Sequence, residues 1–346
     1  MENQIRKPRI RRLNLPTVLG LAAMTTLCSC SHGNAAPHAT SGAPRSFPVS
    51  VGSPALAGTL TLPVRPGRYP AVVLVSGSGP NDQDETVGAD KPFLDIANGL
   101  AAHGIASIRY DKRTKDYPSA INLATFTPTE EYVPDAVAAI HLLQRRSDIY
   151  PSRIFVLGHS QGGTFAPNIA QTDPSVAGII LLAASTESLG SALVRQLTYL
   201  STLPGATGQQ AKATLPEAQQ AAGEIDNPDL SIANRSTWPT SPLLGGASAA
   251  YFLDLRNYDP VATARAIPQP ILILQGGRDY QVTTADDLSV WEQGLAGRAE
   301  TTVHVYPDDD HLFIKGSGPS SPADYAVLKH VDPEVISGIA EWIDSH

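Results

Sequence analysis

The sequence predicts an α/β protein with a mostly parallel sheet that is covered by helices on both sides. Short aliphatic segments recur through most of its 346 residues, and helical segments separate most of them. Most aliphatic segments are continuous rather than alternating, as expected for strands that are buried on both faces. Apolar residues make up 42% of the chain and charged residues 17%, a composition that excludes disorder as the main state.

Seven segments are expected to be strands. Residues 56–63 (LAGTLTLP) alternate apolar and polar positions, which favours an early antiparallel strand. The other six are mainly aliphatic and suit a buried parallel sheet. They are residues 71–75, 105–110, 153–157, 178–182, 271–275 and 301–306.

Helical segments lie between most of these strands, and a last helix closes the chain. Alternation of strands and helices implies crossover connections between parallel strands. The expected helices are residues 93–104, 132–146, 164–171, 285–297 and 333–345.

One long insertion interrupts the alternation. About ninety residues separate the strand at 178–182 from the strand at 271–275, far more than an ordinary connection. Its first part is rich in Ala, Gln and Leu, which predicts helix, and its second part is loop-like. We interpret residues 187–259 as a helical cap over the carboxyl edge of the sheet, where ligands bind in open α/β folds.

The N-terminal segment, residues 1–30, has the layout of a secretory signal peptide: a basic start, a short apolar stretch and small residues. Leu27 lies three positions before Cys30, which resembles a bacterial lipoprotein signal with Cys30 as the lipidated residue. Cys28 departs from that pattern, and plain cleavage near Ala35–Ala36 is the alternative. Residues 31–45 read as a flexible linker. We expect an exported protein, periplasmic or extracellular, with a folded domain at 46–346.

Cysteine usage and charge exclude several kinds of site. Both cysteines lie before residue 31, so the folded domain is expected to have no disulfide, cysteine nucleophile or cysteine-based metal site. The net charge of −8 speaks against a nucleic-acid partner. The acidic residues 81–85 (NDQDE) lack the spacing of a calcium loop, and we expect a solvated turn there. Neither a metal nor a cofactor is expected.

The segment Gly158–Gly162 (GHSQG) matches G-x-S-x-G between a predicted strand and a predicted helix. Small residues on both sides let the strand turn sharply, so that Ser160 presents its hydroxyl above the sheet. The backbone N–H of Gln161 begins the helix, where negative charge is favoured, and is a candidate oxyanion-hole donor. The motif alone is common by chance, and its strand–helix context makes it specific.

A serine nucleophile needs a base, and a histidine and a carboxylate stand at suitable places in the chain. His311 follows the last predicted strand, and Asp279 follows the strand before it. The order Ser160, Asp279, His311 is the one found in serine hydrolases whose serine lies at a sharp strand-to-helix turn, called the elbow. His159, inside the elbow, is expected to point away from the serine.

Five other aspartates lie near Asp279 or His311 in the sequence and are alternatives for the carboxylate. Asp308, Asp309 and Asp310 share the loop of His311 and are expected to be solvated. Asp286 and Asp287 begin a predicted helix, where carboxylates commonly serve as caps.

The second oxyanion donor is expected in residues 76–85, the loop after the strand at 71–75. Glycines there let the backbone approach a substrate oxygen. We assign the donor to the Ser78 N–H, with Gly77 and Gly79 as alternatives.

Together these features resemble the α/β-hydrolase superfamily, and within it bacterial carboxylesterases near the dienelactone-hydrolase group. The resemblance runs from about Leu56 to the end of the chain and is weakest in residues 190–245. Ser76 departs from it, because these esterases usually have His there. The matching segments are residues 76–113, 249–261, 271–283 and 330–343.

The resemblance implies an eight-stranded sheet and a serine hydrolase that cleaves small-molecule carboxylic esters, with short acyl groups, through an acyl-enzyme on Ser160. Arg109, Asp111 and Arg113 are expected to brace the pocket or to form structural ion pairs. A thioesterase, a peptidase with the same triad and a non-catalytic binding protein remain alternatives. A peptidase should carry a propeller or a larger cap.

Overall fold

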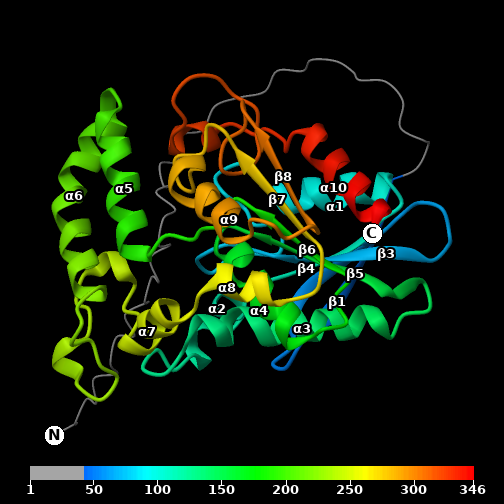
Figure 1. Ribbon diagram of the computed structural model, residues 1–346, viewed down its shortest axis with the longest axis horizontal. Coiled ribbons are helices and arrows are strands. Elements are labelled where there is room, and N and C mark those ends of the chain that lie inside the picture. Colours follow the sequence, from blue (N-terminus) through cyan, green and yellow to red (C-terminus); the bar gives the residue numbers. More distant parts are fainter. Residues whose placement is uncertain (1–42) are drawn as a thin grey trace, which may run out of the picture.

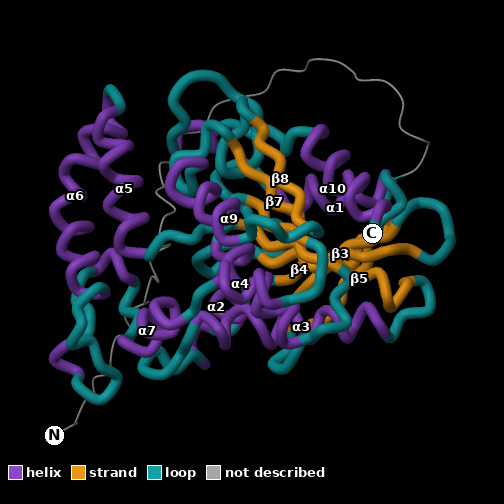
Figure 2. Tube along the Cα trace, in the orientation of Figure 1, coloured by secondary structure: helices purple, strands orange, loops and turns teal. Residues whose placement is uncertain are grey.

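The computed structural model describes residues 43–346, and its centre is an eight-stranded sheet with helices on both faces (Figures 1 and 2). The α/β fold class predicted from the sequence is therefore confirmed. The predicted signal peptide, Cys30 and most of the linker lie outside the described residues. The strands are β1 (Arg45–Val51), β2 (Leu56–Leu62), β3 (Tyr69–Val75), β4 (Ala106–Tyr110), β5 (Ile149–His159), β6 (Gly178–Leu182), β7 (Ile271–Gly276) and β8 (Thr301–Tyr306).

The strand order is β1-β2-β4-β3-β5-β6-β7-β8. β2 pairs antiparallel with both β1 and β4, whereas all pairs from β4 to β8 are parallel. The sequence did not identify β1 as a strand, because most of its side chains are exposed and only Val51 is buried. Arg45, assigned to the linker, already pairs with Leu62 in this edge strand.

Two layers of helices enclose the sheet. α3 (Pro128–Gln144), α4 (Gln161–Thr172), α8 (Pro260–Ala266) and α9 (Ser289–Gly294) cover one face, and α1 (Pro92–Ala102) and α10 (Pro333–Ser345) cover the other. Neighbouring strand residues serve opposite layers: Val73 belongs to the first core, and Val72 and Leu74 to the second. Burial on both faces explains why these strands are continuously aliphatic.

The connection from β6 to β7 forms a separate layer. α5 (Leu189–Thr202) and α6 (Gly205–Ile225) pack along each other as a hairpin that stands beside the sheet, and α7 (Ala249–Asn257) returns the chain toward α8 (Figure 1). The hairpin has an apolar core of its own, which also takes in Tyr280 from the loop after β7. Short turns complete the chain: α2 (Arg113–Asp116), η1 (Pro118–Ala120), η2 (Arg235–Thr237), η3 (Pro242–Leu244), η4 (Thr284–Leu288) and η5 (Pro322–Ala326).

Within residues 43–346, no helix has the combination of length and apolarity that a membrane span requires.

Candidate active site

Ser160 occupies the corner between β5 and α4. Its backbone is strained, with φ 52° and ψ −123°, a region that residues other than glycine rarely enter. A Cβ at Gly158 would lie 2.2 Å from the Gly162 oxygen, and one at Gly162 would lie 2.2 Å from the Val75 oxygen. The corner can form only because both positions lack a side chain.

The loops after β7 and β8 bring Asp279 and His311 together. Asp279 Oδ2 lies 2.7 Å from His311 Nδ1, and both residues are buried. Asp279 Oδ1 accepts hydrogen bonds from the backbone N–H groups of Gln281 (2.7 Å) and Val282 (3.0 Å). The carboxylate is thus held from both ends, and His311 has Nε2 available for a substrate or a nucleophile.

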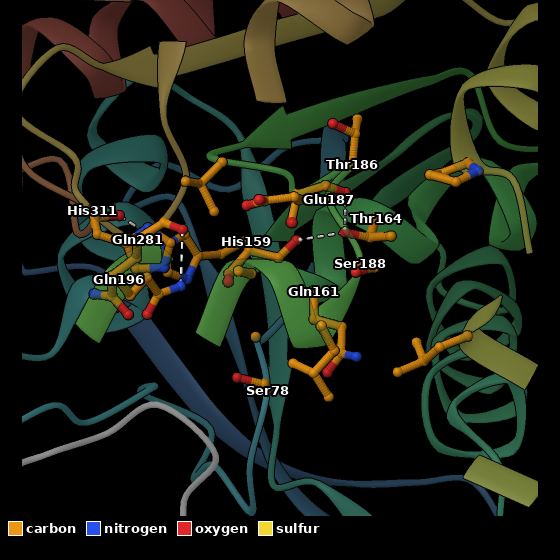
Figure 3. A pocket seen from close by; sticks show the side chains of 18 of the residues that line it. Ser78, His159, Gln161, Thr164, Thr186, Glu187, Ser188, Gln196, Gln281 and His311 are labelled. Carbon is orange, nitrogen blue, oxygen red and sulfur yellow. Dashed lines mark hydrogen bonds between the residues drawn. The ribbon is translucent and has the colours of Figure 1, made fainter. Parts of the chain in front are cut away.

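One cavity of about 350 Å³ is lined by Ser160, Gln161, Ser78 and His311. Figure 3 shows the last three of these residues around it. The loop after β3 approaches the serine closely, since a Cβ at Gly77 would lie 3.0 Å from the Ser160 Cβ. The arrangement places a hydroxyl, an imidazole and backbone amides of two segments around the same space.

Both the backbone N–H and the backbone carbonyl of Gly77 are engaged by buried side chains. Its N–H donates to Glu85 Oε1 at 2.5 Å, and its carbonyl accepts from the buried Lys112 Nζ at 2.9 Å. The Tyr132 hydroxyl lies 3.0 Å from both this carbonyl and Gln161 Oε1. Gly77 is therefore removed from the candidate oxyanion donors on this loop.

Two residues near the serine differ from expectation. Glu85 is 3% exposed, so the predicted solvated turn at 81–85 is wrong for this residue. His159 does not point away from the site: it lines the cavity, and its ring lies 4.6 Å from the ring of His311 (Figure 3). Its Nδ1 lies 2.9 Å from Glu85 Oε1, and its Nε2 lies 2.9 Å from the His311 carbonyl oxygen. Sequence spacing gave no signal for contacts across 74 and 152 positions.

The expected solvation of the aspartates before His311 is also wrong for two of the three. Asp308 is exposed, but Asp309 and Asp310 are buried. Asp310 Oδ1 accepts from the N–H groups of Leu312 (3.0 Å) and Ile314 (3.2 Å), and burial raises its pKa to about 6. Asp310 thus shapes the loop, while Asp279 is the carboxylate in contact with the imidazole.

Asp286 and Asp287 have different surroundings. Asp286 lies in the first turn of η4, where its N–H donates to the hydroxyl of the N-cap residue Thr283 at 2.9 Å. Asp287 is fully buried, and one of its oxygens accepts from the N–H groups of Thr186 (2.9 Å) and Glu187 (3.2 Å). Asp287 therefore anchors the start of the β6–β7 insertion to the core.

Three charged residues, Arg109 in β4 and Asp111 and Arg113 directly after it, form ion pairs and do not line the cavity. Arg109 pairs with Asp84 at 2.8 Å, Arg113 with Asp135 at 2.7 Å, and Asp111 with Lys115.

The insertion supplies much of the cavity wall. Apolar and polar residues of α5 and α7 face the elbow, and a second cavity of about 70 Å³ lies beyond Ser78 and Gln161. Burial raises the pKa of Glu187 at the rim, and its ion pair with Arg195 (2.8 Å) opposes that effect. The lining from the insertion includes Leu189, Ala192, Gln196, Ile225, Phe252, Leu255, Arg256 and Tyr258.

Among the described residues, no group of His, Cys, Asp and Glu could hold a metal ion.

The model of a hydrolase family described as "Serine aminopeptidase, S33" matches residues 91–315, which include the elbow, Asp279 and His311. The chain belongs to this family. Esterase EstD of Thermotoga maritima is a curated relative of this S33-family chain, 38% identical over 288 residues. The match covers 83% of the chain but spans only 65% of the length of EstD.

Solved structures agree with the fold of the S33-family chain. The alpha/beta hydrolase GrgF from a Penicillium species has a TM-score of 0.55 at 17% identity, covering 88% of this chain and 98% of its own. A putative dienelactone hydrolase from Klebsiella pneumoniae has a TM-score of 0.50 at 16% identity, covering 88% and 100%. Together with the hydrolase family match and the 38% identical relative, these folds confirm the predicted resemblance to α/β hydrolases.

Proposed function

We propose that this protein is a serine carboxylesterase that hydrolyses small esters with short acyl groups through an acyl-enzyme on Ser160. The observation that carries the proposal is the 2.7 Å contact between Asp279 and His311 in the cavity that Ser160 lines. The relative named an esterase, at 38% identity, supports ester hydrolysis as the reaction.

In this mechanism, His311 Nε2 takes the Ser160 proton as the hydroxyl attacks the ester carbonyl. Asp279 accepts a hydrogen bond from the Nδ1–H of His311, and this bond fixes the imidazole tautomer and stabilises the imidazolium. The N–H groups of Gln161 and Ser78 stabilise the oxyanion. His311 then returns the proton to the leaving alkoxide, and water, deprotonated by the same imidazole, hydrolyses the acyl-enzyme.

The size of the site supports short acyl groups. The main cavity of about 350 Å³ must hold the ester and its alcohol, and the cavity of about 70 Å³ beyond Ser78 and Gln161 is small and mostly apolar in its lining. A panel of p-nitrophenyl esters should show kcat/KM falling as the acyl chain lengthens. A rise with chain length would contradict the short-acyl part of the proposal.

The decisive test compares wild type with Ser160→Ala. Wild type should hydrolyse p-nitrophenyl acetate and become labelled on Ser160 by a fluorophosphonate, and the folded variant should do neither. Turnover that persists in Ser160→Ala would remove the serine from the mechanism. A labelled wild type that turns over only an acyl-thioester or an aminoacyl p-nitroanilide would instead be a thioesterase or a peptidase.

We also propose that the protein is exported and anchored by a lipid on Cys30, on the strength of the N-terminal sequence. Expression with radiolabelled palmitate should label wild type but not Cys30→Ala. Secretion of an unlabelled wild type would favour plain cleavage.

A further inference from the structure

We propose that Glu85 and His159 form a positioning pair that holds the oxyanion loop and the His311 loop in place around Ser160. The inference rests on the proposed serine-esterase function. Each partner comes from a different segment: Glu85 from the loop after β3 and His159 from the end of β5. The pair contacts Gly77 on one side and the backbone of His311 on the other.

The hydrogen bonds determine where the protons lie. Glu85 Oε1 faces two nitrogens, the Gly77 N–H at 2.5 Å and His159 Nδ1 at 2.9 Å. His159 Nε2 faces a carbonyl oxygen, which can only accept, so Nε2 carries a proton. All three contacts are satisfied together when Glu85 is a carboxylate and His159 is protonated on both nitrogens.

The charges around the pair favour that state. Burial by itself lowers the pKa of His159, but the Glu85 carboxylate and the His311 carbonyl outweigh it, and the pKa lies above its ordinary value of 6.5. Asp279 acts in the same direction from the loop after β7. Lys112 lies on the far side of Gly77, where its buried ammonium donates to the Gly77 carbonyl and pairs with the buried carboxylate of Glu131 (3.0 Å).

Backbone strain at Glu85 shows that the contacts are strong enough to hold an unfavourable conformation. Its φ is 51°, in the left-handed region that a long side chain rarely occupies. Such strain persists only where surrounding contacts over-determine it, and it clusters at functional sites. Here the strained turn places Oε1 beneath Gly77, directly before the candidate donor Ser78.

The pair acts on groups that the chemistry uses. Moving the His311 carbonyl would move its imidazole, and moving Gly77 would move the Ser78 N–H. Displacement of catalytic groups by about 1 Å can cost about 100-fold in rate. Loss of the pair should therefore slow the chemical steps rather than weaken substrate binding.

The first test replaces Glu85 by Gln. The amide oxygen can still accept from the Gly77 N–H, but its neutral side chain no longer favours a doubly protonated His159. A neutral His159 that keeps its Nε2 proton on the His311 carbonyl turns an unprotonated Nδ1 toward that amide oxygen, and the contact between the two side chains is lost. We expect kcat for p-nitrophenyl acetate to fall about 10- to 100-fold with KM nearly unchanged, when both are measured well below the melting temperature of the variant. The matched control is Asp135→Asn, which removes a buried carboxylate from its ion pair with Arg113 (2.7 Å) and should lower Tm but not kcat. A folded Glu85→Gln enzyme with the wild-type kcat would overturn the proposal.

A second pair of variants keeps the test decisive if Glu85→Gln does not fold. In His159→Gln the amide nitrogen reaches about as far as Nε2, so it retains the bond to the His311 carbonyl. In His159→Asn the amide nitrogen matches Nδ1 and cannot reach that carbonyl. We expect the Asn variant to have a kcat about tenfold below that of the Gln variant, and equal kcat values would overturn the tether to His311. A wild type that neither turns over esters nor reacts with fluorophosphonate would refute the proposed function instead.

Discussion

Asp279 illustrates how a single side chain is oriented before any substrate arrives. Two backbone N–H groups hold Oδ1, which leaves Oδ2 directed at His311 Nδ1. An ionised carboxylate in this position can only accept, so Nδ1 must carry the proton and Nε2 must be the basic nitrogen.

Replacing Asp279 with Asn should lower kcat by about 10⁴-fold while the fold is retained, because the amide favours the wrong imidazole tautomer. Steady-state kinetics and circular dichroism check both halves of this expectation. A loss smaller than about tenfold would mean that another carboxylate, with Asp310 the nearest alternative in sequence, supports the base.

Asp309 makes stability depend on pH. Its carboxylate oxygens have no hydrogen-bond partner among the described residues. Burial and then the nearby Asp332 raise its pKa from 3.8 to about 7, against the attraction of Lys315. Between these two pH values the folded protein keeps a proton that the unfolded chain has released. The free energy of unfolding therefore falls as pH rises through this window.

Asp309→Asn should accordingly raise Tm by about 2–4 °C at pH values above 7 and have little effect near pH 4. Thermal melts across this range measure the difference. Asp308→Asn is the control, because the neighbouring carboxylate is exposed and should leave the slope as it is. An Asp309→Asn protein that melts like wild type at every pH would contradict the assignment.

At the scale of elements, the β5–α4 corner depends on the absence of two side chains. A methyl group on Gly162 would overlap the Val75 carbonyl at the end of the neighbouring strand β3, so backbone must move. The strand, the turn and the helix therefore form one geometric unit with Ser160 at its apex.

Gly162→Ala should lower the free energy of unfolding by about 2 kcal/mol or more and reduce kcat, because the corner must open to admit the methyl group. Gly223→Ala provides the contrast, since a Cβ there meets nothing within 4 Å on the exposed side of α6. That change should stabilise the protein by about 0.5–1 kcal/mol, and denaturant titrations distinguish the two. Similar losses in both variants would mean that steric overlap is not the cause.

At the scale of the whole molecule, Arg195 joins the inserted layer to the core. Its guanidinium on α5 donates to the carbonyls of Tyr280 (3.0 Å) and Gln281 (2.9 Å), directly after Asp279. Tyr280 in turn stacks on Tyr199 of α5, with ring centroids 5.2 Å apart. The cavity wall and the loop that carries Asp279 are thus fixed to each other.

Arg195→Met should loosen this attachment and raise KM about three- to tenfold, with a smaller change in kcat. The reason is that the cavity wall held by Arg195 contacts the substrate equally in the ground state and in the transition state. Arg235→Met, on the exposed surface of the same insertion, serves as the control. If Arg195→Met leaves KM at the wild-type value, the insertion does not need this anchor to form the site.

The elements that the sequence predicted are those whose residues follow a regular pattern of burial. Seven strands, the last helix and the strand–Ser160–helix corner follow from local patterns, and the structure shows all of them. The catalytic roles of Ser160, Asp279 and His311 remain predictions that the variants test. β1 was missed because its side chains are mostly exposed. Burial of Glu85 and Asp309 depends on how distant loops pack together, for which a local pattern carries no signal.

The insertion between β6 and α8 begins and ends at the same place, because Glu187 near its start and Tyr258 at its end line one cavity. A segment whose two ends lie at one place can be replaced as a unit without changing the strand order of the sheet. Exchange of residues 187–259 would then change the cavity wall while the strands and loops that carry Ser160, Asp279 and His311 stay the same, provided that the new segment replaces the contact of Arg195 with the loop after β7.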